Sequence, residues 1–151
     1  MQIQRNQPDV RATVCQSQAL FLALRIRSLE AVTDQLFAAE YDPDAGDAAL
    51  FWALPEYDLF HDAAYACGFV CNDLAPDYPV DEANTRPFSK LSREPFDGLR
   101  HYVHTMLRAE RSNRADGYFS PVCSAIQSGA LGLVAQRLTS DDSLYANDAQ
   151  Q

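Results

Sequence analysis

The sequence predicts a mainly α-helical, compact single-domain bundle and leaves room for one short strand element. Apolar residues recur at helical spacing in several long segments, and the 151 residues include only six glycines. The 47% hydrophobic and 22% charged content is that of a folded globular chain. A chain of this length buries roughly two thirds of its unfolded surface in one core. We therefore expect a flexible arm at residues 1–11, a helical domain at 12–140 and a flexible tail at 141–151.

The first long helix is expected between Arg11 and Glu40, in a stretch without glycine or proline. Its apolar residues recur every three or four positions and so fall on one stripe: Leu22, Ile26, Leu29, Val32 and Leu36. A second strip at Leu20 and Leu24 predicts that two sides of this helix are buried. Ser28 leaves open whether the segment forms one helix or two.

Residues 41–47 are predicted as a loop, because a proline and a glycine interrupt the periodicity and aspartates favour turns. The apolar run at 48–54 is compatible with a buried strand or with a helical turn, and its length does not decide between them. Pro55 predicts the start of a helix that continues to Cys67. Gly68 then suits a left-handed cap.

Residues 72–87 are predicted as a long loop, since three prolines and four acids lie within it. A segment of this length without regular structure is typical of binding or mobile loops. A third helix is expected at about 92–111, where apolar residues again follow helical spacing. A fourth is expected at 120–127 with Ser120 as its N-cap, and a short last helix at 130–138.

The most distinctive region is residues 28–85, which contain thirteen carboxylates and no lysine or arginine. Nine aromatic residues lie among these acids. The whole chain carries a net charge of -9. A region of this kind repels nucleic acid phosphates and anionic lipid, and it attracts a basic protein surface.

We expect this region to act as a protein-binding face, because carboxylates pair with arginines and exposed aromatic rings stack on guanidinium groups. The alternative is a solvated acidic surface over ordinary core aromatics. The expected function is to occupy the basic, nucleic-acid-facing surface of a partner. Size and charge suggest an analogy with phage or plasmid inhibitors of host defence complexes, the anti-CRISPR and antirestriction proteins. The predicted contact residues are Tyr57, Asp58, Asp62, Tyr65, Asp73, Asp77 and Asp81.

Two stretches carry a family resemblance: residues 55–59 followed by 65–70, and residues 118–138 with their helix–glycine–helix pattern. They resemble a small uncharacterised bacterial domain-of-unknown-function family that is also found on mobile elements. In that family an aromatic-rich segment precedes a helical C-terminus with a similar turn. This chain has Phe69 where the family tends to have tryptophan. The family has no established activity, so the resemblance implies no functional residue.

A zinc-binding protein or small enzyme is one alternative. Cys67 and Cys71 lie near one helix end, and His101 and His104 lie on another helix. Two thiolates and two imidazoles complete a tetrahedral zinc site where a fold brings them together. Against it, the spacing of the two thiols exceeds that of a zinc knuckle and is usual for a core pair. Alternating aspartates at 42–47 resemble a calcium loop, but the glycine and the bidentate glutamate that such a loop needs are out of place.

A helix-turn-helix-like transcriptional regulator is the other alternative. Residues 127–138 have a helix-turn-helix character. Five arginines are available for phosphate contacts: Arg100, Arg108, Arg111, Arg114 and Arg137. The net negative charge opposes this alternative, because phosphate contacts supply most of the affinity for nucleic acid.

The sequence predicts a soluble, cytoplasmic protein. Four cysteines, two of them in apolar helical contexts, fit buried thiols in a reducing compartment. The N-terminus is polar and lacks the apolar core of a signal peptide, and the longest apolar run, residues 19–24, is too short to span a bilayer. We expect no catalytic site and no cofactor, because no nucleophile motif or glycine-rich phosphate loop is present.

Overall fold

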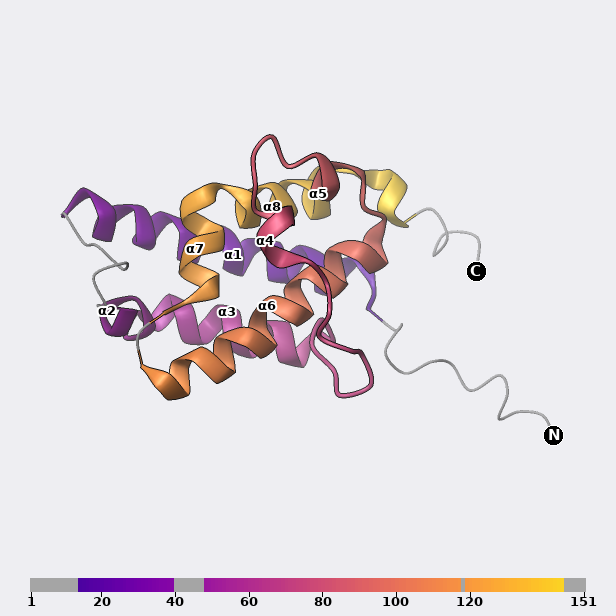
Figure 1. Ribbon diagram of the computed structural model, residues 1–151. Helices are drawn as coiled ribbons and strands as arrows, with labels where there is room; N and C mark the ends of the chain where they lie inside the picture. The colour runs from indigo at the N-terminus through magenta and orange to yellow at the C-terminus, as the bar shows by residue number, and fades with distance from the viewer. Residues whose placement is uncertain (1–13, 40–47, 118, 146–151) are drawn as a thin grey trace.

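The computed structural model describes residues 14–39, 48–117 and 119–145. Within these ranges it contains eight α-helices, one short 3-10 helix and no strand, which confirms a mainly α-helical bundle (Figure 1). None of the described helices is both long and apolar enough to cross a membrane. The elements are α1 Gln16–Ala38, α2 Ala48–Trp52, α3 Pro55–Ala66, α4 Val80–Ala83, α5 Ser89–Arg93, α6 Phe96–Asp116, α7 Pro121–Ser128, α8 Ala130–Ser140 and η4 Asp142–Tyr145.

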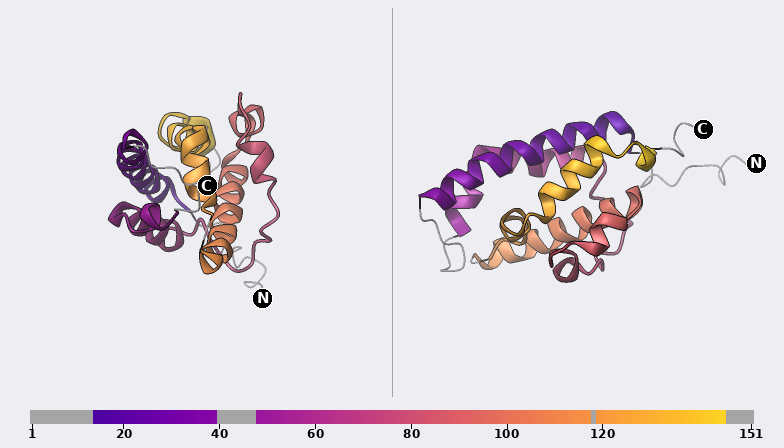
Figure 2. Two further views of the ribbon diagram at one scale, coloured as in Figure 1. Left: turned by 60° about the vertical axis from the view of Figure 1, so that its left-hand side comes forward. Right: turned by 90° about the horizontal axis from the view of Figure 1, so that it is seen from above.

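The long helix α1 packs against α3 and α8, and α7 joins α8 to α6 (Figure 2). The short helices α4 and α5 lie on the side of α6 that faces away from α3 (Figure 2). The core between these layers is filled by fully buried side chains, among them Leu22, Ile26, Leu29, Phe60, Tyr102, Met106, Leu107, Leu131 and Val134. Helix α6 has neighbouring elements on two sides, so its residues contribute to the protein surface on each of these two sides.

Helix α1 is continuous, so Ser28 does not divide it. The predicted stripe is buried from Leu22 to Leu29. The prediction that Leu20 and Leu24 are also buried is wrong, since their side chains are 38% and 59% exposed. The physical reason is that α3 and α8 cover one side of α1 and leave its other side to solvent within the described part of the chain.

The strand alternative for residues 48–54 is wrong, because α2 is a helix. Ala48, Phe51 and Trp52 are buried together. Helical spacing places all three on one face, whereas a strand would point Ala48 and Phe51 to opposite faces. The ring of Phe51 meets the ring of Tyr57 on α3 edge-on, with 5.4 Å between the centroids.

The predicted loop at 72–87 is held against α6 by hydrogen bonds from its backbone. The amide of Tyr78 donates to Oγ1 of Thr105 at 3.1 Å, and Nε2 of His101 donates to the carbonyl oxygen of Ala75 at 2.9 Å. Polar side chains of a helix thus replace the backbone partners that a strand or helix would supply. The short helices α4 and α5 form in and after this segment, and four or five residues carry too little periodicity to predict them.

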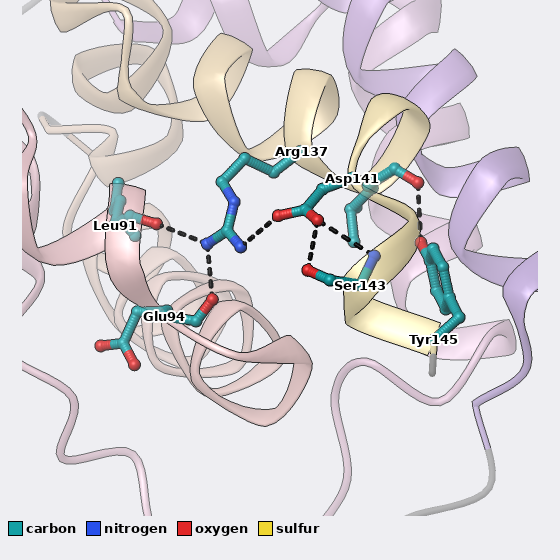
Figure 3. A network of polar contacts seen from close by, with 7 residues as sticks. Leu91, Glu94, Arg137, Asp141, Ser143 and Tyr145 are labelled. Carbon is teal, nitrogen blue, oxygen red and sulfur yellow. Dashed lines mark hydrogen bonds and ion pairs between the residues drawn. The ribbon is translucent and has the colours of Figure 1, made fainter. Parts of the chain in front are cut away.

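Residues 141–145 are part of the fold, so the prediction of a flexible tail at 141–151 is wrong for them. The 3-10 helix η4 ends at Tyr145, which is buried. Its hydroxyl donates to the carbonyl oxygen of Leu138 at 2.7 Å (Figure 3). The buried ring of Tyr145 anchors this polar segment to the bundle. The amino-acid composition of the segment does not predict that contact. Residues 146–151 and the predicted arm at 1–11 lie outside the described residues.

Arg137 fixes the same end of the bundle. Its guanidinium donates to the carbonyl oxygens of Leu91, at 2.9 Å, and Glu94, and to Oδ2 of Asp141 at 2.6 Å (Figure 3). The amide of Ser143 donates to the other oxygen of Asp141 at 3.1 Å. Hydrogen bonds lower the pKa of Asp141, and those from Ser143 contribute more than those from Arg137. The junction between α5 and α6 is thereby tied to α8.

Candidate functional site

The seven predicted contact residues do not lie on one face. The five acids among them occupy three segments, with Asp58 and Asp62 on α3, Asp73 and Asp77 before α4, and Asp81 on α4. Helices α3 and α4 lie on opposite sides of α6 (Figure 2). The fold therefore divides the predicted acidic face into two groups of carboxylates.

The two predicted tyrosines are less accessible than expected. Tyr57 is 1% exposed, so the prediction that it contacts a partner as an open ring is wrong. Its position on α3 faces α2 and α6, which cover it. Tyr65 is half-buried and lies beside His61, with 4.7 Å between the ring centroids.

Several acids of residues 28–85 have partners within the protein. Arg27 donates to Glu30 at 2.9 Å, and Oδ1 of Asp77 lies 2.9 Å from Nε2 of His101. The remaining exposed acids are therefore fewer than the count along the chain suggests. Four of the thirteen lie outside the described residues, and so does the segment 42–47 that resembles a calcium loop: Glu40, Asp42, Asp44 and Asp47.

The predicted zinc ligands are not assembled. His104 is buried, and backbone groups engage both of its ring nitrogens. Nε2 donates to the carbonyl oxygen of Leu74 at 2.7 Å, and Nδ1 accepts from the amide of Cys71 at 3.4 Å. Burial lowers the pKa of His104, which keeps the imidazole neutral in this role. No group of three or more His, Cys, Asp or Glu side chains within the described ranges is placed to hold a metal ion.

Two of the five arginines predicted for the helix-turn-helix alternative are engaged within the protein. Arg100 is 5% exposed, and its Nε donates to the carbonyl oxygen of Gly68 at 2.9 Å. Arg137 is engaged by the contacts of Figure 3. Helix α8, which would enter a DNA groove, is buried along most of its length. The other three of the five lie on α6, as Arg100 does: Arg108, Arg111 and Arg114.

A groove of about 550 Å³ lies between α4, α6 and the start of α7, and we call it the acidic groove. Asp81 and Glu82 line it, and among the described residues no lysine, arginine or histidine does. Its apolar lining includes Met106, Pro121 and the 40% exposed Phe119. The other lining residues are Tyr78, Pro79, Val80, Asn84, Thr105, Ala109, Asn113 and Ser124. An apolar groove with acids on one wall suits a segment that carries both basic and apolar side chains.

Hydrogen bonds hold the α4 wall of this groove in place. The hydroxyl of Tyr102 donates to Oδ1 of Asn84 at 2.6 Å, directly after α4. The hydroxyl of Tyr78 donates to Glu94. Burial raises the pKa of both tyrosines, so both hydroxyls remain donors. A wall that is already fixed loses less conformational entropy when a partner binds.

A second groove, of about 510 Å³, lies between α3 and α6, and we call it the arginine groove. Three aromatic or imidazole side chains of α3 and three residues of α6 line it: Tyr57, His61, Tyr65, Arg111, Arg114 and Ala115. No carboxylate in the part of the chain that the structure describes lines this groove. Its lining is therefore the reverse of the acidic groove in charge.

Arg114 is held over two rings. Its guanidinium carbon lies 5.3 Å from the ring centroid of Tyr57 and 5.9 Å from that of Trp52. Such contacts are attractive because the ring face carries a negative quadrupole. Among the ion pairs of the described residues, none involves Arg111 or Arg114.

A buried carboxylate, Glu110, lies on α6 between Ala109, which lines the acidic groove, and Arg111, which lines the arginine groove. It accepts hydrogen bonds from Nε1 of Trp52 at 2.6 Å and from the amide of Val122 at 3.0 Å. The hydroxyl of Ser120 donates to it at 2.8 Å and also caps α7 by accepting from the amide of Cys123 at 3.0 Å. Burial raises the pKa of Glu110, and its hydrogen bonds act in the opposite direction. Glu110 therefore ties α2, α6 and the start of α7 together.

Reasoning from the sequence does not single out Glu110 or Phe119. One signal was available for Glu110, since it follows Met106 by four residues and so falls on the apolar stripe of α6. A glutamate on such a stripe is almost never fully buried without partners. The pattern predicts that partners exist, but only the packing of α2 and α7 identifies them.

No family model matches the chain, and neither a curated protein nor a solved structure matches it. The resemblance to a bacterial domain-of-unknown-function family therefore stays a prediction from the residues that carry it.

Proposed function

We propose that this protein is an acidic protein-binding module whose acidic groove receives a basic segment of a partner protein. The main support is that Asp81 and Glu82 border a partly apolar groove that no basic residue of the described ranges lines. The net charge of -9 adds a long-range field that draws in a cationic surface.

The proposed contact set is smaller than the seven residues predicted from the sequence. Asp81 remains in it, and Glu82 and Phe119 join it. Asp58 and Asp62 lie on the far side of α6, so they contribute to the overall field and not to this contact (Figure 2).

The two kinds of lining have different roles. An exposed ion pair contributes only about 0.2–1 kcal/mol, so the acids alone give little affinity. Aromatic and apolar anchors in a desolvated pocket supply most of the binding energy of typical interfaces. We therefore assign affinity to an apolar side chain packed against Phe119 and the partly buried Val80, and selection and association rate to Asp81 and Glu82.

The proposed partner surface is one that ordinarily faces nucleic acid, because such surfaces concentrate lysine and arginine. A protein that covers such a surface blocks access to the nucleic acid. A phage or plasmid inhibitor of a host defence complex, of the anti-CRISPR or antirestriction type, is the function that this size and charge favour.

The test is a capture from cell lysate at low and high salt, followed by calorimetry with the purified partner. The variant Asp81→Asn/Glu82→Gln is compared with Asp58→Asn/Asp62→Asn, which removes the same charge from α3. We expect a basic partner, about tenfold weaker binding for the first variant and no more than about a twofold change for the second. Nucleic acid should compete with the protein for the partner.

Two outcomes would contradict the proposal. One is binding that ignores salt concentration, since steering by charge is screened by ions. The other is an equal loss of affinity in the two double variants, which would show that net charge acts without the groove.

A further inference from the structure

We propose that the arginine groove binds a small planar anion, a ring that carries a phosphate or carboxylate group. Its α3 wall consists of Tyr57, His61 and Tyr65, which follow one another every four residues and so stand in one row. The ring centroids are 6.1 Å apart for Tyr57 and His61 and 4.7 Å apart for His61 and Tyr65. The interplanar angles of 31° and 34° show that successive rings are tilted against each other. Tyr57 is buried, so the partly buried rings of His61 and Tyr65 are the ones on which a further planar group can stack.

The α6 wall supplies the positive charge. Arg111 and Arg114 are three positions apart and therefore face the same side of the helix. The rings of Trp52 and Tyr57 already orient Arg114. Planar guanidinium groups recognise phosphate and carboxylate through paired hydrogen bonds, so two of them at one groove favour an anion.

The nearby acids do not satisfy these arginines. Asp62 does not line the groove; its side chain is 80% exposed, and its Oδ1 lies 3.4 Å from Nδ1 of the lining His61. Glu110 does not line it either, and its carboxylate oxygens accept hydrogen bonds from Trp52 and Val122. Within the described part of the chain, an anion in the groove therefore meets two guanidinium groups and no lining carboxylate.

The groove also has the size of a small-molecule site. Its volume of about 510 Å³ lies within the usual range for ligand pockets. A nucleoside monophosphate combines the required features, with its base stacked on His61 or Tyr65 and its phosphate between Arg111 and Arg114. Adenosine monophosphate is accordingly the first probe, and benzoate represents planar carboxylates.

In the experiment, each probe is titrated into the protein, and binding is measured by calorimetry and by the fluorescence of Trp52. Trp52 is the single tryptophan of the chain, and its ring lies under the guanidinium of Arg114. Adenosine and inorganic phosphate are the control ligands, because each contains only one of the two parts of adenosine monophosphate. We expect saturable binding of adenosine monophosphate and at least about tenfold weaker binding of either half. Saturable binding of benzoate alone would also support the site and assign it to carboxylates. If no probe binds saturably at millimolar concentration, the proposal is wrong.

Variants locate the binding. Arg111→Gln and Tyr65→Leu should each weaken adenosine monophosphate binding about tenfold, because both residues line the groove. Arg108→Gln is the matched control, since Arg108 is on α6 and does not line it. Thermal unfolding of each variant verifies the fold, and Arg114→Lys provides a second measurement that retains the charge but loses the planar fork. Equal weakening by Arg108→Gln would overturn the proposal.

Discussion

The two grooves of this protein share one helix and have nearly equal volumes, about 550 and 510 Å³, yet their charges are opposite. Helix α6 contributes Thr105, Met106, Ala109 and Asn113 to the acidic groove, and Arg111, Arg114 and Ala115 to the arginine groove. Successive residues of an α-helix are turned by about 100° about its axis, so residues two positions apart point to nearly opposite sides of the helix.

Charge counted along a chain is therefore a poor guide to the charge of a surface. Residues 28–85 contain no lysine or arginine, yet they supply Tyr57 and Tyr65 to the groove that two arginines line. The acids of the same region are divided between opposite sides of the bundle. The surface charge depends on which helices meet, and a linear count does not contain that information.

The largest expected effect tests whether the two grooves share their support. In Glu110→Gln, the amide group must face either Nε1 of Trp52 or the amide of Val122, and both are donors. A buried donor without an acceptor costs about 1–3 kcal/mol, so we expect a loss of about 3 kcal/mol in the free energy of unfolding. Denaturant unfolding measures it, and binding at both grooves should weaken together.

The control for that substitution is Asp116→Asn, because Asp116 is an exposed acid on the same helix. It should change the free energy of unfolding by no more than about 0.5 kcal/mol. If Glu110→Gln weakened one groove and left the other intact, Glu110 would not be their common support.

Two substitutions with smaller expected losses of stability should distinguish the support of the acidic groove from that of the arginine groove. Ser120→Ala removes the cap of α7 and one donor to Glu110 on the side of the acidic groove, with an expected loss of about 1–2 kcal/mol. Trp52→Phe removes a donor on the side of the arginine groove, with an expected loss of about 1 kcal/mol. Hydrogen exchange should show faster opening of the Cys123 amide in Ser120→Ala. Equal opening of that amide in both variants would mean that the two sides are not independent.

The smallest expected effect is a pH dependence confined to the acidic groove. His104 holds the segment that leads to Tyr78 and α4, and burial lowers its pKa below the unfolded value of 6.5. The unfolded state then binds more protons, so the free energy of unfolding should fall as the pH drops below 6.5 toward the folded pKa. Exchange of the Cys71 amide should accelerate over this range, while the arginine groove keeps its affinity.

The matched variant for this test is His104→Gln, which retains a donor for the carbonyl oxygen of Leu74 and cannot titrate. It should be less stable at neutral pH but should lack the loss of stability below pH 6.5. The same acid dependence in His104→Gln would assign the effect to another group.

Several features of the fold are readable from the sequence because they depend on neighbours a few residues away. The stripe of α1 from Leu22 to Leu29 follows from helical spacing. The side chain of Ser120 caps α7 by accepting a hydrogen bond from the amide of Cys123, three residues later, as its position before Pro121 indicates. Gly68 has the positive φ of 85° expected of a left-handed cap.

The rest depends on which segments meet, and local spacing does not specify that. Tyr57 is buried because α2 and α6 cover it, and Leu24 is exposed because nothing in the described chain covers it. The same long-range packing joins Glu110 to Trp52 and Val122, whose positions in the sequence lie on either side of it. By itself the sequence determined helices, caps and an excess of acids, since these follow from local propensity and composition. The tertiary structure decided where the acids lie and which of them have partners, because burial and charge are set by distances in space.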